Sequence, residues 1–210
     1  LMQYLEGIPA ANIASLELIN NPPASYDAEG TGGVINIVTK NYEVDGLTGN
    51  ATLYAGYGER EKYGGSASIN LKAKRLNVYA DVSISQDYTN QNTFINSEIA
   101  FDNGVLNSDQ NSIRPAFSGN YNGKIGFSYD ISSNTNIDIF GTASRRRWEL
   151  EAETTSLYAG TISAASNDFL LSTETNTTNQ YQISARLQHH LDERHTLSTD
   201  YDYIRFDIQN

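Results

Sequence analysis

The 210-residue sequence contains no cysteine, only four prolines and no apolar segment long enough to cross a membrane as a helix. Without cysteine there is neither a disulfide framework nor a thiolate metal site. A membrane helix needs roughly 20 consecutive apolar residues, so a helical membrane protein is excluded. A transmembrane β-barrel is not excluded, because its lipid-facing residues alternate with polar ones and never form such a run.

Basic residues are also scarce, with 14 lysines and arginines against 25 aspartates and glutamates and a formal net charge of −11. Nucleic-acid-binding proteins need a basic face against the phosphates, so we expect no nucleic-acid partner. Hydrophobic residues make up 39% of the chain, which is few for a globule with a two-sided core. The chain is nevertheless too rich in tyrosine, isoleucine and leucine to be disordered.

From Gly46 onward the sequence contains a strict alternation of apolar and polar residues. Leu53 and Ala55, for example, alternate with Thr52 and Tyr54. Such a period of two predicts strands with one apolar and one polar face. A soluble antiparallel sheet with one wet face would show the same alternation. The pattern predicts seven strands, over residues 47–57, 66–72, 76–85, 120–131, 136–144, 180–191 and 197–203.

Short and long connections alternate between these strands, apart from a brief first connection at residues 58–62. Tight turns are expected at residues 74–75, 132–135 and 192–194, whereas long polar loops are expected at residues 89–118 and 150–176. In an up-and-down meander, alternate connections fall at opposite ends of the strands. This asymmetry is typical of outer-membrane barrels, which have short periplasmic turns and longer extracellular loops.

Residues 16–40 carry a composite motif ahead of the first predicted strand. After a short expected helix at residues 9–15, the chain reads LELI at residues 16–19, PPASY at 22–26 and GGVINIVTK at 32–40. This motif resembles the end of the plug domain of TonB-dependent outer-membrane receptors, which leads directly into the first barrel strand. The residues that carry the resemblance, in structural roles, are Pro22, Pro23, Tyr26, Gly32, Gly33 and Asn36.

The resemblance has two departures from the family pattern. Asn21 stands where the family usually has glycine, and residues 27–30 replace a more glycine-rich segment. This variant resembles the outer-membrane barrel group common in Bacteroidota. The resemblance implies an all-β fold, an antiparallel up-and-down transmembrane β-barrel. Residues 1–43 would be the C-terminal segment of a plug domain, and residues 44–210 the first seven strands of a larger, incomplete barrel.

The function that the resemblance implies is import of a scarce nutrient, such as a siderophore, cofactor, oligosaccharide or peptide, through the plugged barrel. The protein would lie in the outer membrane of a Gram-negative bacterium, in contact with lipid and lipopolysaccharide. TonB would pull on the plug through an N-terminal segment absent from this sequence, and a surface lipoprotein would be a further partner. Two alternatives remain, a passive porin-type barrel and a soluble β-rich binding or adhesion module.

One basic and aromatic cluster, residues 145–148, ends the fifth predicted strand next to a long loop. Alternation places Arg145 and Arg147 outward, where guanidinium groups could bind lipid phosphates. It places Arg146 and Trp148 toward the lumen, where they could contact a ligand. Alternatively, the arginines pair with the carboxylates that follow them, Glu149, Glu151 and Glu153.

The sequence offers little for catalysis or for a metal. His189, His190, Asp192, Glu193 and His195 crowd a single turn, and imidazoles with carboxylates can bind zinc. Adjacent residues of a strand point to opposite faces, however, so His189 and His190 cannot easily share an ion. No nucleophile motif such as G-x-S-x-G is present. We therefore expect no catalytic residues, no metal and no cofactor.

Overall fold

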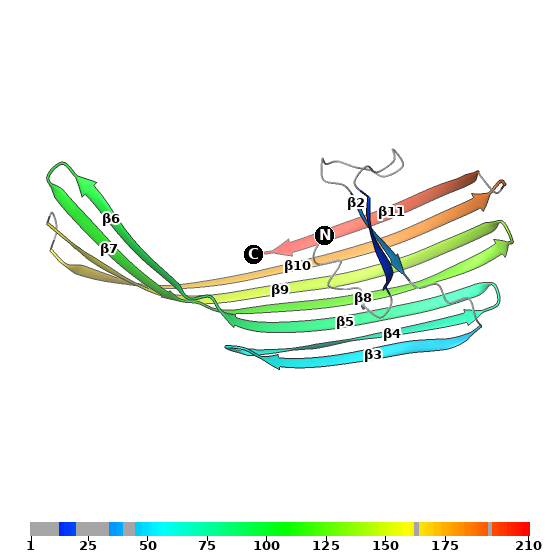
Figure 1. Cartoon of the computed structure of the whole chain (residues 1–210), viewed down its shortest axis with the longest axis horizontal. Helices are drawn as coiled ribbons and strands as arrows, with labels where there is room; N and C mark the ends of the chain where they lie inside the picture. The colour runs from blue at the N-terminus through cyan, green and yellow to red at the C-terminus, as the bar shows by residue number, and fades with distance from the viewer. Residues whose placement is uncertain (1–12, 20–33, 40–44, 162–163, 193–194) are drawn as a thin grey trace.

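The computed structural model describes residues 13–19, 34–39, 45–161, 164–192 and 195–210, and its regular elements are all strands (Figure 1). β1 (Ile13–Ile19) pairs with β2 (Val34–Thr39) in a two-stranded antiparallel sheet. Within the described ranges, no helix is long and apolar enough to cross a membrane. The other nine strands are β3 (Gly46–Tyr57), β4 (Glu61–Ala73), β5 (Leu76–Asn90), β6 (Thr93–Phe101), β7 (Gly104–Ile113), β8 (Pro115–Ser132), β9 (Thr135–Gly160), β10 (Ser166–His190) and β11 (Thr196–Gln209).

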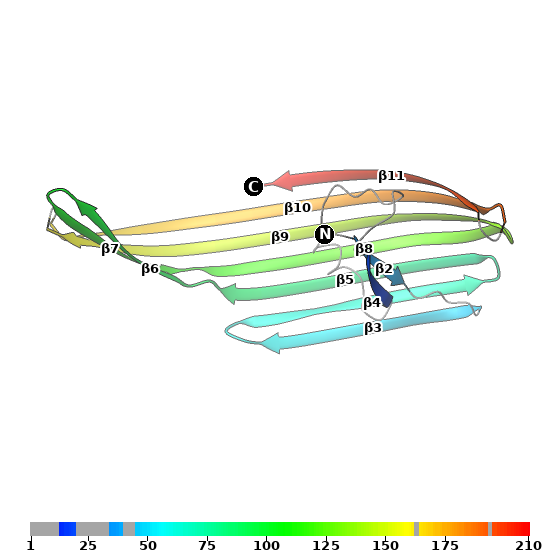
Figure 2. The same cartoon turned by 45° about the horizontal axis from the view of Figure 1, so that its top comes forward.

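The nine strands form one antiparallel sheet, which confirms the predicted all-β, antiparallel fold. Its main path runs in the order β11-β10-β9-β8-β5-β4-β3, and these seven strands contain the seven predicted segments. Neighbouring strands of this path follow one another in the chain, except that β6 and β7 are inserted between β5 and β8. Among the described strands the sheet is open, with β3 and β11 at its two edges. Figure 2 shows it as a single curved layer.

The tight turns lie together at one end of the sheet, on the right of Figure 1. The β4–β5 turn consists of Lys74 and Arg75, as predicted, and Lys74 adopts a positive φ of 52°. Its backbone N–H donates a hydrogen bond of 2.7 Å to the Asp45 side chain. The β8–β9 turn is equally short, and there Asn134 N–H donates to Ser132 Oγ at 3.2 Å. Two-residue connections of this kind fix the register of the strands that they join.

The sequence predicted that the two long connections are loops. In the structure they instead continue the sheet. Residues 89–118 contain β6 and β7, and residues 150–176 belong largely to β9 and β10. β7 pairs with β9 beyond Pro115, where β8 begins. Four strands, β6, β7, β9 and β10, therefore extend past the main sheet. We call this region the extension, which comprises β6, β7, residues 150–160 of β9 and residues 166–174 of β10.

The sequence did not predict the extension. Alternation of apolar and polar residues detects a strand only when its two faces differ in hydrophobicity. The strands of the extension carry polar residues on both faces and are held by backbone pairing and cross-strand polar contacts. Ser112 Oγ and Thr154 Oγ1 lie 2.8 Å apart, and Gln110 Nε2 donates to Ser156 Oγ at 3.2 Å. The predicted helix is wrong where it can be compared, because Ile13–Ser15 belong to β1. The rest of residues 9–15 lies outside the described residues.

The main sheet has one apolar and one polar face, as the alternation predicts. Ile69, Ile125 and Ile183 lie in one row across the apolar face and are 51%, 65% and 55% exposed. The only buried hydrophobic residues in the described part of the chain are Ala116, Leu150 and Ala152. The complete row consists of Gly49, Ile69, Ala80, Ile125, Gly141, Ile183 and Tyr203.

The opposite, polar face carries amide, hydroxyl and charged side chains along the same strands. The row next to the one above consists of Asn50, Ser68, Asp81, Lys124, Thr142, Gln182 and Ile204. β11 departs from the pattern beyond Tyr203, because Arg205 and Asp207 fall on the apolar face and form an ion pair of 3.0 Å. The main sheet is therefore a single layer with two chemically different surfaces and no core between them.

Two glycines of β8, Gly126 on the polar face and Gly123 on the apolar face, test how tightly the polar face packs. A Cβ atom at Gly126 would lie 2.6 Å from the Tyr79 ring and 2.7 Å from Phe140 Cβ, whereas one at Gly123 would meet only the Ala143 carbonyl oxygen at 4.0 Å. We expect Gly126→Ala to destabilise the fold by about 1–3 kcal/mol through overpacking. Gly123→Ala should be neutral or slightly stabilising.

The measurement is the midpoint of urea unfolding in detergent micelles, followed through the fluorescence of the single tryptophan. Equal destabilisation by the two alanines would contradict the packing described for the polar face.

Candidate binding site on the polar face

A pocket lies on the polar face at the point where the extension begins. It has a volume of about 340 Å³ and is open to solvent on one side. β9 contributes Arg146 and Trp148, and β10 contributes Glu174, Asn176 and Thr178. Arg146 pairs in register with Thr178, and Trp148 with Asn176, so the pairing of β9 with β10 brings these side chains together.

The strand alternation explains which residues of the basic cluster reach the pocket. Arg146 and Trp148 lie on the polar face, in register with Asn120 and Ser118 of β8. Arg145 and Arg147 alternate with them and therefore lie on the apolar face. The cluster is thus divided between two surfaces of the sheet, which have different neighbours.

Ion pairing also divides the cluster. Arg147 forms an ion pair with Glu149, two residues away on the same face. Among the described residues, neither Arg145 nor Arg146 has a carboxylate partner, although both are exposed. Pairing with the following carboxylates, which the sequence left open, therefore holds for one arginine of the three.

The pocket combines groups suited to binding a ligand. The guanidinium of Arg146 offers several donors in a planar fork, which matches a carboxylate or phosphate. Trp148 is partly buried and adds an indole ring with an N–H donor. Asn176 donates a hydrogen bond to Glu174 across the pocket wall, which orients both side chains. This arrangement can bind a ligand with an anionic or hydrogen-bonding group, and the indole ring of Trp148 provides a flat apolar contact surface.

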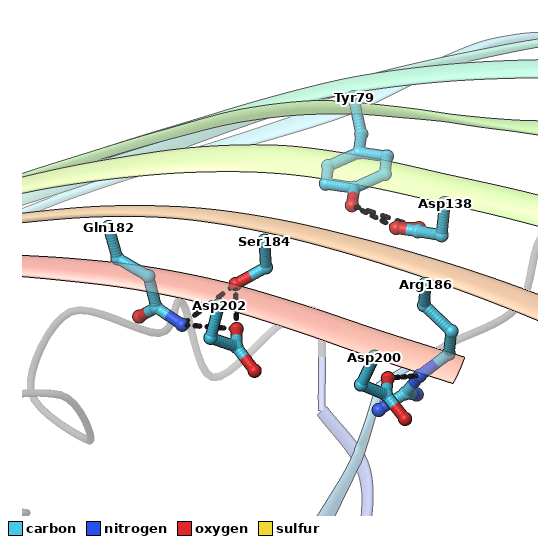
Figure 3. A network of polar contacts seen from close by, with 7 residues as sticks. All are labelled: Tyr79, Asp138, Gln182, Ser184, Arg186, Asp200 and Asp202. Atoms are coloured by element: carbon cyan, nitrogen blue, oxygen red, sulfur yellow. Dashed lines mark hydrogen bonds and ion pairs between the residues drawn. The ribbon is translucent and has the colours of Figure 1, made fainter. Parts of the chain in front are cut away.

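A second group of polar side chains lies further along the same face, toward the tight turns (Figure 3). The Tyr79 hydroxyl donates to Asp138 at 3.1 Å, and Ser128 donates to the same carboxylate at 3.0 Å. Lys124 lies over the rings of Tyr79 and Phe140, 5.2 and 4.6 Å from their centres. Three strands are therefore joined by polar and cation–π contacts.

This network continues across β10 and β11. Gln182 donates to Ser184 at 2.8 Å, and both side chains donate to Asp202. Arg186 forms an ion pair with Asp200 on the neighbouring strand. The sequence analysis placed these residues on a polar face but did not single them out. The pattern of charges could have identified these contacts, because the register sets Arg186 opposite Asp200 and Ser184 opposite Asp202.

Most of the residues that carry the plug motif lie outside the described residues. These are Pro22, Pro23, Tyr26, Gly32 and Gly33. Asn36 is described on β2, and its side-chain amide donates a 2.8 Å hydrogen bond to Glu17 on β1. Glu17 and Asn36 are also partners in the strand register, so this contact supports the pairing of β1 with β2.

The histidines near the β10–β11 turn each have a local partner. His189 and His190 contact Thr135 and Thr196, in each case with Nδ1 and Oγ1 2.9 Å apart. His195 Nδ1 lies 2.8 Å from an Asp192 carboxylate oxygen. No group of three potential metal-binding side chains gathers anywhere in the described ranges.

Comparison with known proteins adds no relative to this description. No protein-family model matches the chain, and no curated protein matches it either.

Proposed function

We propose that this chain forms part of the wall of a TonB-dependent outer-membrane transporter, together with the end of its plug. The single observation that carries the proposal is the apolar face, which exposes large hydrophobic side chains on six of the seven strands of the main path, all but β9. Soluble monomers rarely expose contiguous apolar patches larger than a few hundred Å². A bilayer removes this conflict, because lipid chains cover the outward face of a barrel while water fills its interior.

Aromatic residues at both ends of the apolar face support a membrane location. At the end near the extension, the rings of Tyr88 and Phe117 meet in a tilted arrangement with centres 4.8 Å apart, and Arg60 lies 5.4 Å from the centre of the Tyr88 ring. Toward the opposite end lie Tyr129 and Tyr201. In transmembrane barrels, girdles of aromatic residues flank an apolar band about 25 Å tall.

The spacing of the two aromatic ends along β8 agrees with such a band. Phe117 and Tyr129 both lie on the apolar face and are separated by roughly 40 Å of strand, at about 3.3 Å per residue. At a tilt of about 45° this length projects to roughly 28 Å. The two girdles would then lie just outside the hydrocarbon band.

The polar face supplies the transport surface in this proposal. Seen from inside a barrel, it is a hydrated wall, and the Arg146–Trp148 pocket would face the entering nutrient. The strand pair β1–β2, with the plug-like motif around it, would belong to the plug that closes the lumen. TonB would act on that plug, and a surface lipoprotein could meet the long hairpins from outside.

Arg145 is the member of the cluster best suited to lipid contact. It lies on the apolar face in one row with Ile84 and Tyr121, and it has no ion pair with described residues. This row lies four residues inside the row of Phe117 along β8, so the long Arg145 side chain would have to extend toward that end of the sheet for its guanidinium to bind a lipopolysaccharide phosphate bidentately. Arg147 is less available, because Glu149 already neutralises it.

Conductance in planar lipid bilayers separates a plugged transporter from a passive porin. We expect the full-length protein to insert without a steady open conductance. Deletion of residues 13–39, which removes β1 and β2, should open a large and steady one, because the plug no longer fills the lumen. A steady conductance before the deletion would support the porin alternative, and failure of both proteins to insert would support a soluble module.

The sidedness of the sheet provides a second test on intact cells. The chain has no cysteine, so single cysteines report without background. The account predicts that a membrane-impermeant maleimide labels cysteines at the exposed positions Asn103 and Asn167, which lie at the long-hairpin end. A cysteine at Asn134, in a tight turn, should react only after the outer membrane is permeabilised. Labelling of all three positions on intact cells would contradict the proposed orientation.

A further inference from the structure

The outer edge of β6 is free, and it differs from the other free edges of the sheet. β6 pairs only with β7 among the described strands. On its other side the nearest strand of the main sheet is β4, whose pairing with β5 ends at Lys62 and Asp87. β6 begins at Thr93, roughly 20 Å further along the chain direction. Closure of a barrel through β3 and β11 would therefore leave the edge of β6 unpaired.

β6 has few of the features that usually protect an edge strand. Natural edges are protected by proline, by charged side chains and above all lysine, by β-bulges or by very short strands, and of these β6 has only the single charge of Glu98. Residues 93–101 contain no proline, lysine or arginine, and the register with β7 runs without a break from Thr93 to Phe101. Every residue from Phe94 to Phe101 is exposed. Nine residues whose outer edge is unpaired among the described strands are a ready acceptor for another strand.

The charge of the extension selects the kind of strand that can bind. Its strands contain no lysine or arginine, and no acidic residue on them has an ion pair within the described part of the chain. A second copy of this protein would bring two acidic extensions together, which electrostatic repulsion opposes. A cationic segment is attracted instead. The acidic residues are Glu98, Asp109, Glu151, Glu153, Asp168 and Glu174.

The two faces of β6 define the side-chain pattern of that segment. Ile95, Ile99 and Phe101 lie on the face shared with the pocket, about half exposed. Glu98 lies on the opposite face, as does Asp109 of β7, and Phe94 lies on that face nearer the start of β6. A strand next to β6 would therefore place apolar side chains on the first face and cationic ones on the second.

We propose that the free edge of β6 binds a cationic, extended polypeptide segment by β-strand addition, with lysine or arginine alternating with apolar residues. Backbone hydrogen bonds would supply affinity, and the alternation would supply specificity. This inference rests on the observed edge and charge and does not require that the protein transport anything.

The test uses the purified full-length protein in micelles of an uncharged detergent. The probe is a fluorescently labelled peptide of four Lys-Ile repeats, and binding is followed by fluorescence anisotropy at low salt. We expect saturable binding, and at least tenfold weaker binding of the same peptide with every backbone nitrogen methylated. Methylation removes the backbone N–H donors of the peptide but keeps its charge. Equal binding of both peptides would therefore mean that the peptide adsorbs through charge without adding a strand, which would overturn the proposal.

Two matched protein variants locate the site. Glu98→Lys should weaken binding of the Lys-Ile peptide roughly tenfold, since it reverses the charge beside the added strand. Glu59→Lys makes the same chemical change at an exposed position of the β3–β4 turn and should leave binding unchanged. Both positions are exposed, so both variants should fold, and circular dichroism checks this.

Equal weakening by the two variants, no binding to the unmodified protein, or dimerisation of the protein through β6 in light scattering would each overturn the proposal. Because this assay needs neither a bilayer nor a nutrient, its failure would leave the transport proposal intact. Failure of the conductance test would likewise leave the edge proposal intact.

Discussion

The constraint on which the structure depends is that a single-layer sheet cannot cover its own apolar face. A folded soluble domain buries such a face against a second layer of helices or strands. Here the described residues provide no second layer over the main sheet, and large side chains such as Leu53, at 89% exposure, have no apolar partner on the outside. A surrounding medium or a binding partner must therefore cover the apolar face. Any function proposed for the chain has to account for this cover.

Because no core exists, the sheet is held by directional contacts. Backbone pairing fixes the strands, and the polar face adds a second set of contacts from Tyr79 and Asp138 to Arg186 and Asp200. Individually such exposed contacts stabilise a protein little. In a barrel they would serve a second purpose, because a hydrated wall needs polar side chains whichever nutrient passes along it.

The sequence predicted the parts of the fold in which the two faces differ chemically. Alternation located all seven strands of the main path, and turn residues such as Lys74 and Arg75 marked the tight ends. It failed for the extension, where Ser112, Thr154 and Gln110 are polar and both faces are wet, so no hydrophobic period is present. Alternation also placed Arg146 and Trp148 on one face, but their partners on β10 depend on the register of two long strands. Register depends on the turn and on the hydrophobic pattern of both strands together, so the sequence of one strand alone does not fix it.

Spin labels along β8 in lipid bilayers would test the central claim most directly, namely that lipid covers one face of the sheet and water the other. Labels at positions 121, 123, 125, 127 and 129 lie on the apolar face, and labels at 120, 122, 124 and 128 on the polar face. The account predicts that oxygen, which concentrates in lipid, relaxes the odd-numbered labels more strongly. A water-soluble nickel chelate should relax the even-numbered labels, so that the two profiles alternate with a period of two and in opposite phase. Equal access of the nickel chelate to both sets of positions would contradict the account.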